Sequence, residues 1–197
     1  MPFIGGADVI VKQYDDQNWK TQQELSYEGK IQNWTVPSET DTDFASVPRV
    51  FVWFLPRYGR YTRAAILHDY LWRTQAADGR ISWIDADAVF RRAMRELEVP
   101  FLRRWMMWTA VRWAALTKPQ GMAGWWRESW RVLLVTLIAA PFVIPPAVVI
   151  FASLVLFWVL ETILWVPLKL VSLIRSKAAP REPLKEVNAP TFDLKMS

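Results

Sequence analysis

The feature that most constrains this chain is an apolar run from Val132 to Leu168, in which Glu161 is the single ionisable side chain. About 18 consecutive, predominantly apolar residues meet the criterion for a membrane-spanning helix. In a chain of 197 residues, the remaining residues are too few to surround such a run as the core of a soluble protein. The sequence therefore predicts a membrane segment.

Prolines divide this run and predict a hairpin. A Pro-Pro pair such as Pro145-Pro146 normally ends or sharply kinks a helix, and Pro141 lies close before it. Residues 132–144 would reach only about 20 Å as a helix, short of a hydrocarbon core of about 30 Å, whereas residues 147–168 could cross it. We therefore expect a re-entrant or interfacial first arm, a break at Pro145-Pro146 and a longer second arm.

The flanks of the run indicate its orientation. Basic residues favour the cytoplasmic side and tryptophans favour the headgroup level, so a hairpin with both ends in the cytoplasm is expected. The N-terminus lacks the basic and apolar regions of a secretory signal, which places the preceding domain in the cytoplasm and the hairpin in the inner membrane of a bacterial host. The flanking residues are Trp125, Trp126, Arg127, Trp130 and Arg131 before the run and Trp165, Lys169, Arg175, Lys177 and Arg181 at its end.

Composition excludes several classes of function. A net charge of +5 and a pI near 9.6 would suit nucleic acid, but no nucleic-acid-binding motif accompanies them, and 13 tryptophans with 10 phenylalanines favour a membrane interface. No nucleic acid partner is expected. The absence of cysteine excludes disulfides, thiolate metal sites and cysteine nucleophiles.

Ahead of the run, the pattern predicts an α+β domain. Short β-prone pieces at residues 9–11, 24–27 and 30–36 predict a small N-terminal antiparallel sheet, and a loop follows Pro37. Three helices then follow, of which the first has His68 on a face with Tyr61, Ala65 and Trp72, and the second starts with a capping box at Ser82 and Asp85. The expected helices span about residues 61–73, 82–97 and 101–116, and the expected domains are residues 1–120, the membrane segment 121–176 and a flexible tail 177–197.

Three phrases in the domain gather the residues able to do chemistry: Thr42–Arg49, Ala64–Leu71 and Asp85–Phe90. They contain the only histidine, several carboxylates and a serine. Carboxylates with one imidazole can hold a hard divalent cation, so Asp43, His68 and Asp87 are the candidate ligands of a metal ion, and no other cofactor is expected. The candidate catalytic residues are Asp43, Ser46, His68 and Asp87, and the candidate binding residues are Arg49, Asp69 and Tyr70.

On these phrases the chain resembles a phage and prophage family known as domain of unknown function 1353. The resemblance covers roughly residues 31–113 and includes Pro37, the approach Gly59–Thr62 and the segment from Ala86 to Phe90. Glu98 departs from it, since glycine is expected before Val99, and the membrane segment lies outside it. Members are usually short soluble proteins encoded in phage genomes, without a settled activity, so the resemblance implies an origin and a fold but no mechanism.

Specific catalytic patterns are incomplete. An HD-type phosphohydrolase needs further histidines, and Ser46 is not in a Gly-x-Ser-x-Gly elbow. A structural interpretation is therefore favoured for the group: Asp43 anchors Arg49 or His68, Asp69 pairs with Arg73 four residues later, and His68 is a hydrogen-bonded core residue.

We expect a phage- or prophage-derived, membrane-anchored accessory protein that acts by contacts at the inner membrane during infection or particle assembly. Its partners would be the lipid bilayer and a protein of the phage or host envelope. The alternative is a membrane-tethered hydrolase, either metal-dependent or metal-free, that uses Asp43, His68 and Asp87.

Overall fold

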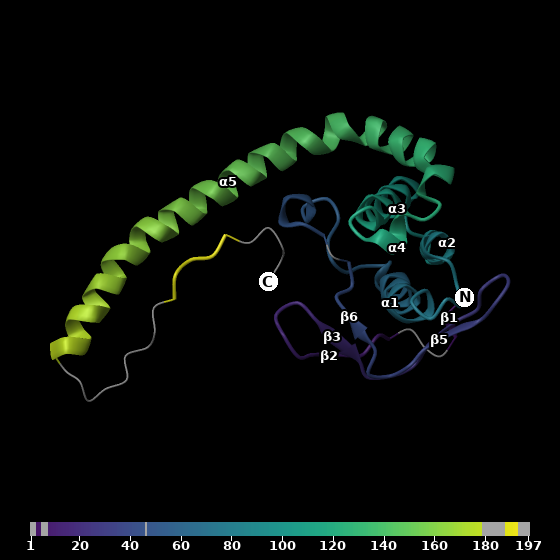
Figure 1. The fold of residues 1–197 in the computed structure, drawn as a ribbon, viewed down its shortest axis with the longest axis horizontal. Coiled ribbons are helices and arrows are strands. Elements are labelled where there is room, and N and C mark those ends of the chain that lie inside the picture. Colours follow the sequence, from purple (N-terminus) through teal and green to yellow (C-terminus); the bar gives the residue numbers. More distant parts are fainter. Residues whose placement is uncertain (1–2, 5–7, 46, 179–187, 193–197) are drawn as a thin grey trace.

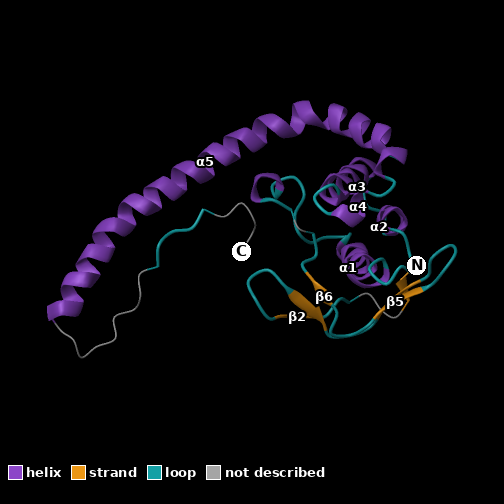
Figure 2. Cartoon of the chain, viewed as in Figure 1, coloured by secondary structure: helices purple, strands orange, loops and turns teal. Residues whose placement is uncertain are grey.

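The computed structural model describes residues 3–4, 8–45, 47–178 and 188–192. Short strands and several helices form a folded domain, and one long helix leaves it and arches away (Figure 1). The strands lie on one side of the domain and the helices on the other (Figure 2). The predicted α+β class is confirmed.

The strands form two small antiparallel sheets where one was expected. Asp15 accepts hydrogen bonds from the backbone N–H groups of Gln17 and Asn18, which closes a tight turn and lets two polar segments pair as β2 and β3. β6 then adds to β3, so Thr42 belongs to a strand and not to the predicted loop. The sheets are β1 (Phe3–Ile4), β4 (Leu25–Tyr27) and β5 (Trp34–Val36), and β2 (Val11–Gln13), β3 (Trp19–Thr21) and β6 (Asp41–Thr42).

The first sheet buries alternate side chains against α1. Leu25 and Tyr27 of β4 and Trp34 and Val36 of β5 point into the core, because successive residues of a strand face opposite sides. They pack with buried residues of α1 and α2 in a single cluster. The sheet therefore serves as a platform for the helices that carry the candidate site.

The three predicted helices are present. A short 3-10 turn, η1 (Arg49–Phe51), precedes α1 (Thr62–Tyr70), which continues as a π-helical turn, η2 (Leu71–Gln75). α2 (Trp83–Glu96) starts as expected, with the Ser82 hydroxyl accepting a hydrogen bond of 3.1 Å from the Asp85 N–H, and α3 (Phe101–Ala115) follows.

Glu98 lies in the connection between α2 and α3 with a φ of +57°. This left-handed conformation favours glycine, and it lets the Val99 N–H reach the Met94 carbonyl at the end of α2. The position is therefore the one where glycine was expected from the family resemblance, and Glu98 occupies it with an unfavourable backbone conformation.

The packing of the domain continues into the beginning of the long helix. After α4 (Pro119–Met122) and η3 (Trp125–Arg127), the buried side chains of Trp125 and Val132 pack with Trp108 of α3. Trp125 also donates a hydrogen bond of 2.8 Å to the Arg112 carbonyl. The first turn of the long helix is thus fixed to α3.

The long helix, α5 (Ser129–Ala178), is continuous, so the expected break at Pro145-Pro146 and the hairpin are wrong. Each proline removes one backbone donor but keeps a φ compatible with a helix, and α5 absorbs the change as a gentle curve (Figure 1).

Most of the predicted flexible tail lies outside the described residues. Residues 188–192 are described and lie against α5, where the Phe192 ring packs 5.8 Å from the Trp158 ring and 6.1 Å from the Phe151 ring, centroid to centroid.

Candidate functional site

The three helices meet at Asp87, a carboxylate with no exposed surface. Its Oδ1 lies 2.7 Å from His68 Nε2 and accepts a hydrogen bond of 2.9 Å from Trp72 Nε1. Its Oδ2 accepts a hydrogen bond of 2.8 Å from Nη1 of Arg112, which is also fully buried. We call these four residues the Asp87 network.

Helical spacing explains how the network forms. His68 and Trp72 are four residues apart and point to the same side, as the sequence predicted. The His68 ring packs against Phe90, one turn after Asp87 on α2, with 4.7 Å between the ring centroids. Burial alone would raise the pKa of Asp87, but hydrogen bonds from His68, Arg112 and Trp72 favour the charged form and hold the pKa below its ordinary value.

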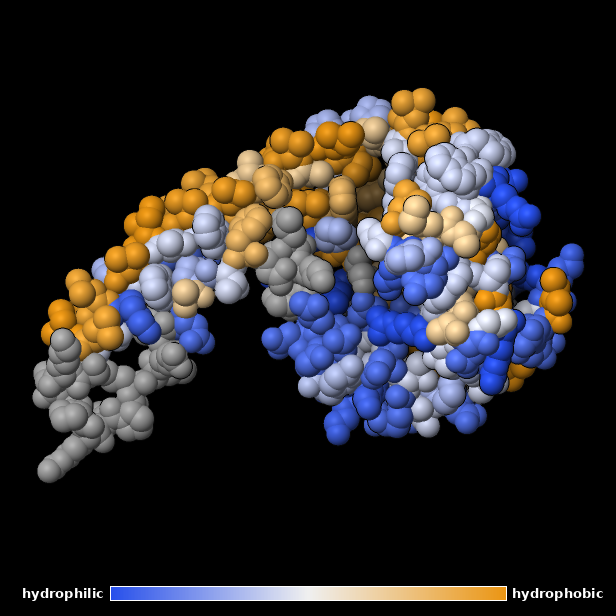
Figure 3. Space-filling model, in the orientation of Figure 1, coloured by the Kyte–Doolittle hydropathy of each residue, from blue (hydrophilic) through white to orange (hydrophobic). Residues whose placement is uncertain are grey.

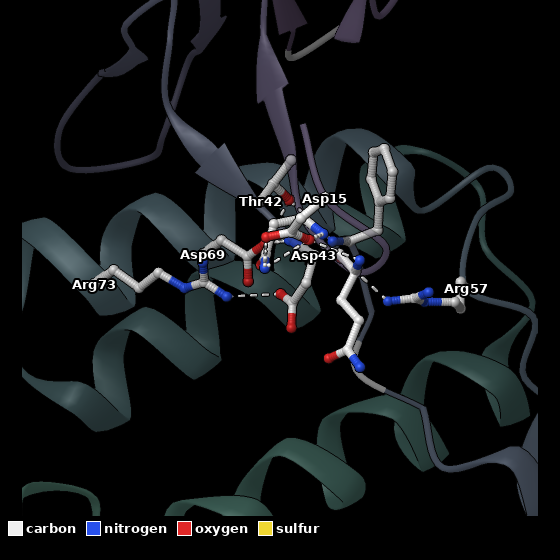
Figure 4. Close-up of polar contacts among 9 residues, drawn as sticks. Asp15, Thr42, Asp43, Arg57, Asp69 and Arg73 are labelled. Carbon is white, nitrogen blue, oxygen red and sulfur yellow. Dashed lines mark hydrogen bonds and ion pairs between the residues drawn. The ribbon is translucent and has the colours of Figure 1, made fainter. Parts of the chain in front are cut away.

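A second buried carboxylate, Asp69, lies where α1 meets β6 (Figure 4). Its Oδ2 accepts a hydrogen bond of 2.5 Å from the Thr42 hydroxyl and one of 3.3 Å from the Asp43 N–H. The Thr42 hydroxyl accepts the Phe44 N–H at 3.0 Å, which shapes the start of the predicted loop. We call Thr42, Asp43, Asp69 and Arg73 the Asp69 cluster.

The electrostatics of Asp69 are opposite to those of Asp87. Burial and the neighbouring Asp43 carboxylate raise the pKa of Asp69 to about 7. Asp43 remains partly exposed and accepts a hydrogen bond of 2.8 Å from Arg73 Nη2 (Figure 4). This partner corrects the expected pairing of Arg73 with Asp69. The Asp69 carboxylate accepts hydrogen bonds from Thr42 and the Asp43 N–H instead, while the Asp43 side chain receives Arg73.

The predicted candidates thus fall into two groups. His68 and Asp87 are joined directly, whereas Asp43 belongs to the Asp69 cluster. Tyr70 accepts a hydrogen bond of 2.6 Å from Gln75 Nε2. Arg49 is the first residue of η1, and Ser46 lies outside the described residues. Among the residues that the structure describes, no group of three or more acidic or histidine side chains is arranged to hold a metal ion.

Sequence reasoning missed Thr42, Trp72 and Arg112 as partners of the buried carboxylates. For Arg112 a signal existed, because it follows Trp108 by four residues on the side of α3 that packs into the protein. A buried guanidinium requires an acceptor, and this requirement pointed to a buried carboxylate.

The two groups differ in what they can do chemically. The Asp87 network ties three helices together and has its carboxylate fully engaged. The Asp69 cluster pairs a partly exposed carboxylate with a buried one that exchanges its proton near neutral pH. Such a pair can carry acid–base chemistry, although structural carboxylates also show shifted pKa values.

Comparison with known proteins identifies a family for part of the chain. Residues 19–111, slightly less than half of the 197 residues, match the family described as protein of unknown function (DUF1353). The matched residues include the whole Asp69 cluster and all of the Asp87 network except Arg112. The match confirms the resemblance expected from the sequence. No curated protein and no solved structure matches the chain.

Proposed function

We propose that this is a phage- or prophage-derived accessory protein, anchored by α5 in the inner membrane of a bacterial host. Its folded domain lies in the cytoplasm and contacts a protein of the phage or host envelope during infection or particle assembly. The observation that carries the proposal is α5: residues Ser129–Ile174 have a window with a mean hydropathy of 2.5, and none of that window is buried in the protein. The apolar side chains form a band along the arm, in contrast to the polar domain (Figure 3).

The length and charge of α5 suit a bilayer. Forty-six residues extend about 69 Å, more than twice the hydrocarbon thickness of about 30 Å, so a part of the helix suffices. The stretch between Val132 and Glu161 is uncharged and long enough to cross without burying that carboxylate. As one continuous span, α5 would place its own C-terminal end on the opposite side of the membrane from the domain. This topology replaces the one expected for a hairpin.

The anchoring is tested by extracting membranes with alkaline carbonate after expression of the full chain. The wild type should stay in the pellet. The double variant Val148→Arg/Val149→Arg should move to the supernatant, since an arginine near the centre of a spanning helix costs about 2.5–3.5 kcal/mol. Both valines lie near the middle of the uncharged stretch and are exposed on α5, so the substitutions leave the domain intact. The matched control is Ile31→Arg, on an exposed isoleucine of the domain, and a wild type that is released without detergent would refute the proposal.

A tethered hydrolase is the second candidate, and the Asp69 cluster is the observation that favours it. Of the residues suggested from the sequence, Asp43 is the carboxylate that is partly exposed, next to Asp69 with its pKa raised to about 7. The full chain in detergent would be assayed on chromogenic esters and phosphodiesters, with and without Mn²⁺. Hydrolysis that Asp43→Asn abolishes, and that Asp78→Asn on an exposed turn preserves, would support it. Turnover that is identical in both variants would remove it.

A further inference from the structure

Arginine side chains stack on aromatic rings where α2, α3 and the start of α5 meet. The Arg91 guanidinium of α2 lies 4.4 Å from the ring centroid of Trp105 and 5.3 Å from that of Trp108, both on α3. Arg131 lies 5.1 Å from the Trp130 ring, at the start of α5. Arg104 lies 5.5 Å from the Phe101 ring, at the start of α3. Such stacking fixes guanidinium groups in place while their N–H donors remain able to bind other groups.

Positive charge accumulates at this junction. Burial lowers the pKa of Arg91, and the nearby Arg131, Arg104 and Arg95 lower it further, while Glu128 opposes them. Glu128 is the carboxylate among these neighbours, and its Oε1 accepts a hydrogen bond of 3.2 Å from Arg131 Nη1 while its Oε2 is buried without a hydrogen-bond partner. A single carboxylate leaves the charge of four guanidinium groups largely unbalanced. Arg91 Nε is buried and has no hydrogen-bond partner. An anion with several oxygen acceptors would complement these groups. We call Arg91, Arg95, Arg104 and Arg131 the arginine cluster.

The position of the cluster indicates which anion reaches it. Arg131 directly precedes Val132, where the apolar part of α5 begins. The neighbouring Trp126 and Trp130 are 82% and 60% exposed, as suits side chains that lie among lipid headgroups. When α5 enters a bilayer at this end, the arginine cluster comes to lie at the level of the lipid phosphates.

We infer that the arginine cluster binds the phosphate of an anionic lipid in the leaflet where α5 enters the membrane. The inference rests on the proposed anchoring by α5. Arginine suits this role because its planar guanidinium binds phosphate oxygens through two parallel N–H donors. The domain would thereby be held against the membrane surface in a defined orientation, in addition to its covalent connection to α5.

The test measures thermal unfolding of the full chain in a non-ionic detergent, with phosphatidylglycerol, phosphatidylcholine or inorganic phosphate added. Phosphatidylglycerol should raise the wild-type Tm by about 2–4 °C more than phosphatidylcholine does, because a ligand of the folded state stabilises it. The double variant Arg95→Gln/Arg104→Gln should lose this difference. Arg95 is exposed and Arg104 is half-buried, and the variant leaves Arg91 and its stacking on Trp105 and Trp108 in place. The matched control is Arg60→Gln/Arg80→Gln, which removes the same charge from two exposed arginines elsewhere in the domain.

Three results would overturn the inference: equal stabilisation by both lipids, an unchanged difference in the cluster variant, or the same loss in the control. An equal effect of inorganic phosphate would identify a site for a soluble anion and would also exclude the lipid. Carbonate extraction keeps the two proposals separate. A cluster variant that stays in the pellet shows that α5 still anchors the chain, whereas a wild type that is released refutes the anchoring itself.

Discussion

The folded domain and α5 differ in where their side chains find partners. In the domain, the fully buried Asp87 receives hydrogen bonds or ion pairs from His68, Trp72 and Arg112, which belong to other elements of the same chain. In α5, no residue of the most apolar window is buried inside the protein. The domain therefore supplies its own partners, whereas α5 is long and apolar enough to span a membrane. Under the proposed anchoring, the domain carries the tertiary contacts of the fold and α5 sets the location of the protein.

The same comparison applies at a smaller scale to the two buried carboxylates. Asp87 faces a guanidinium and stays charged, whereas Asp69 faces a hydroxyl and the carboxylate of Asp43. Burial is similar in both, so the partners determine the direction in which the pKa moves. Asp87 is thus suited to holding helices together, and Asp69 to exchanging a proton.

The largest expected effect comes from Asp87→Asn. The substitution leaves the fully buried Arg112 guanidinium without its counter-charge, and breaking a buried ion pair in this way costs roughly 3–5 kcal/mol. Denaturant unfolding of the full chain in detergent measures the loss. Asp78→Asn, at an exposed turn position, should change the free energy of unfolding by less than about 0.5 kcal/mol. Equal stability of the two variants would show that Asp87 does not hold the helices together.

Asp69→Asn should make the stability of the protein depend less on pH. Unlike the loss of an ion pair, it should stabilise the protein above neutral pH. The pKa of Asp69 is about 7 in the folded state, against an ordinary value of 3.8, so Asp69 loses its proton at a lower pH in the unfolded chain than in the folded protein. In the wild type, the stabilising contribution of Asp69 is fully present below about pH 4. It decreases as the pH rises toward 7, by at most about 1.4 kcal/mol per pH unit. Asparagine does not titrate, and its oxygen can still accept the Thr42 hydroxyl.

The variant should therefore be more stable than the wild type at pH 8, with a flatter profile between pH 4 and 7. Thermal unfolding of both proteins across this range measures the difference. Parallel profiles would contradict the assignment. Asp87 has the opposite pH dependence because its pKa is lowered in the folded state. Its stabilising contribution is present above the pKa of the unfolded chain and is lost as the pH falls through the pKa of the folded protein.

A smaller loss, roughly 1–3 kcal/mol, is expected for His68→Ala, since Asp87 keeps its other partners but loses one hydrogen bond. Mn²⁺ or Zn²⁺ should shift the Tm of neither the wild type nor the variant. A stabilisation by either cation that depends on His68 would favour the metal-dependent hydrolase instead.

Local patterns in the sequence predicted much of the domain, and long-range partners account for what they missed. The face of α1 that carries His68 followed from helical spacing, and the start of α2 followed from Ser82 and Asp85. The second sheet did not, because its short polar strands are held by the turn at Asp15 and by pairing with β6, 20 residues away in sequence. The partner of Arg73 also escaped prediction, since Asp43 lies 30 residues away in sequence.

The most direct test of the central claim, that α5 lies in lipid while the domain lies in water, uses the absence of cysteine from the chain. Single cysteines are introduced as Leu156→Cys on α5 and Ile31→Cys on the domain, both at exposed positions. A membrane-impermeant maleimide is then added to inverted inner-membrane vesicles, whose outer surface is the cytoplasmic one. We predict that Ile31→Cys reacts in intact vesicles and that Leu156→Cys reacts only after detergent is added. Rapid labelling of Leu156→Cys in intact vesicles would contradict the account.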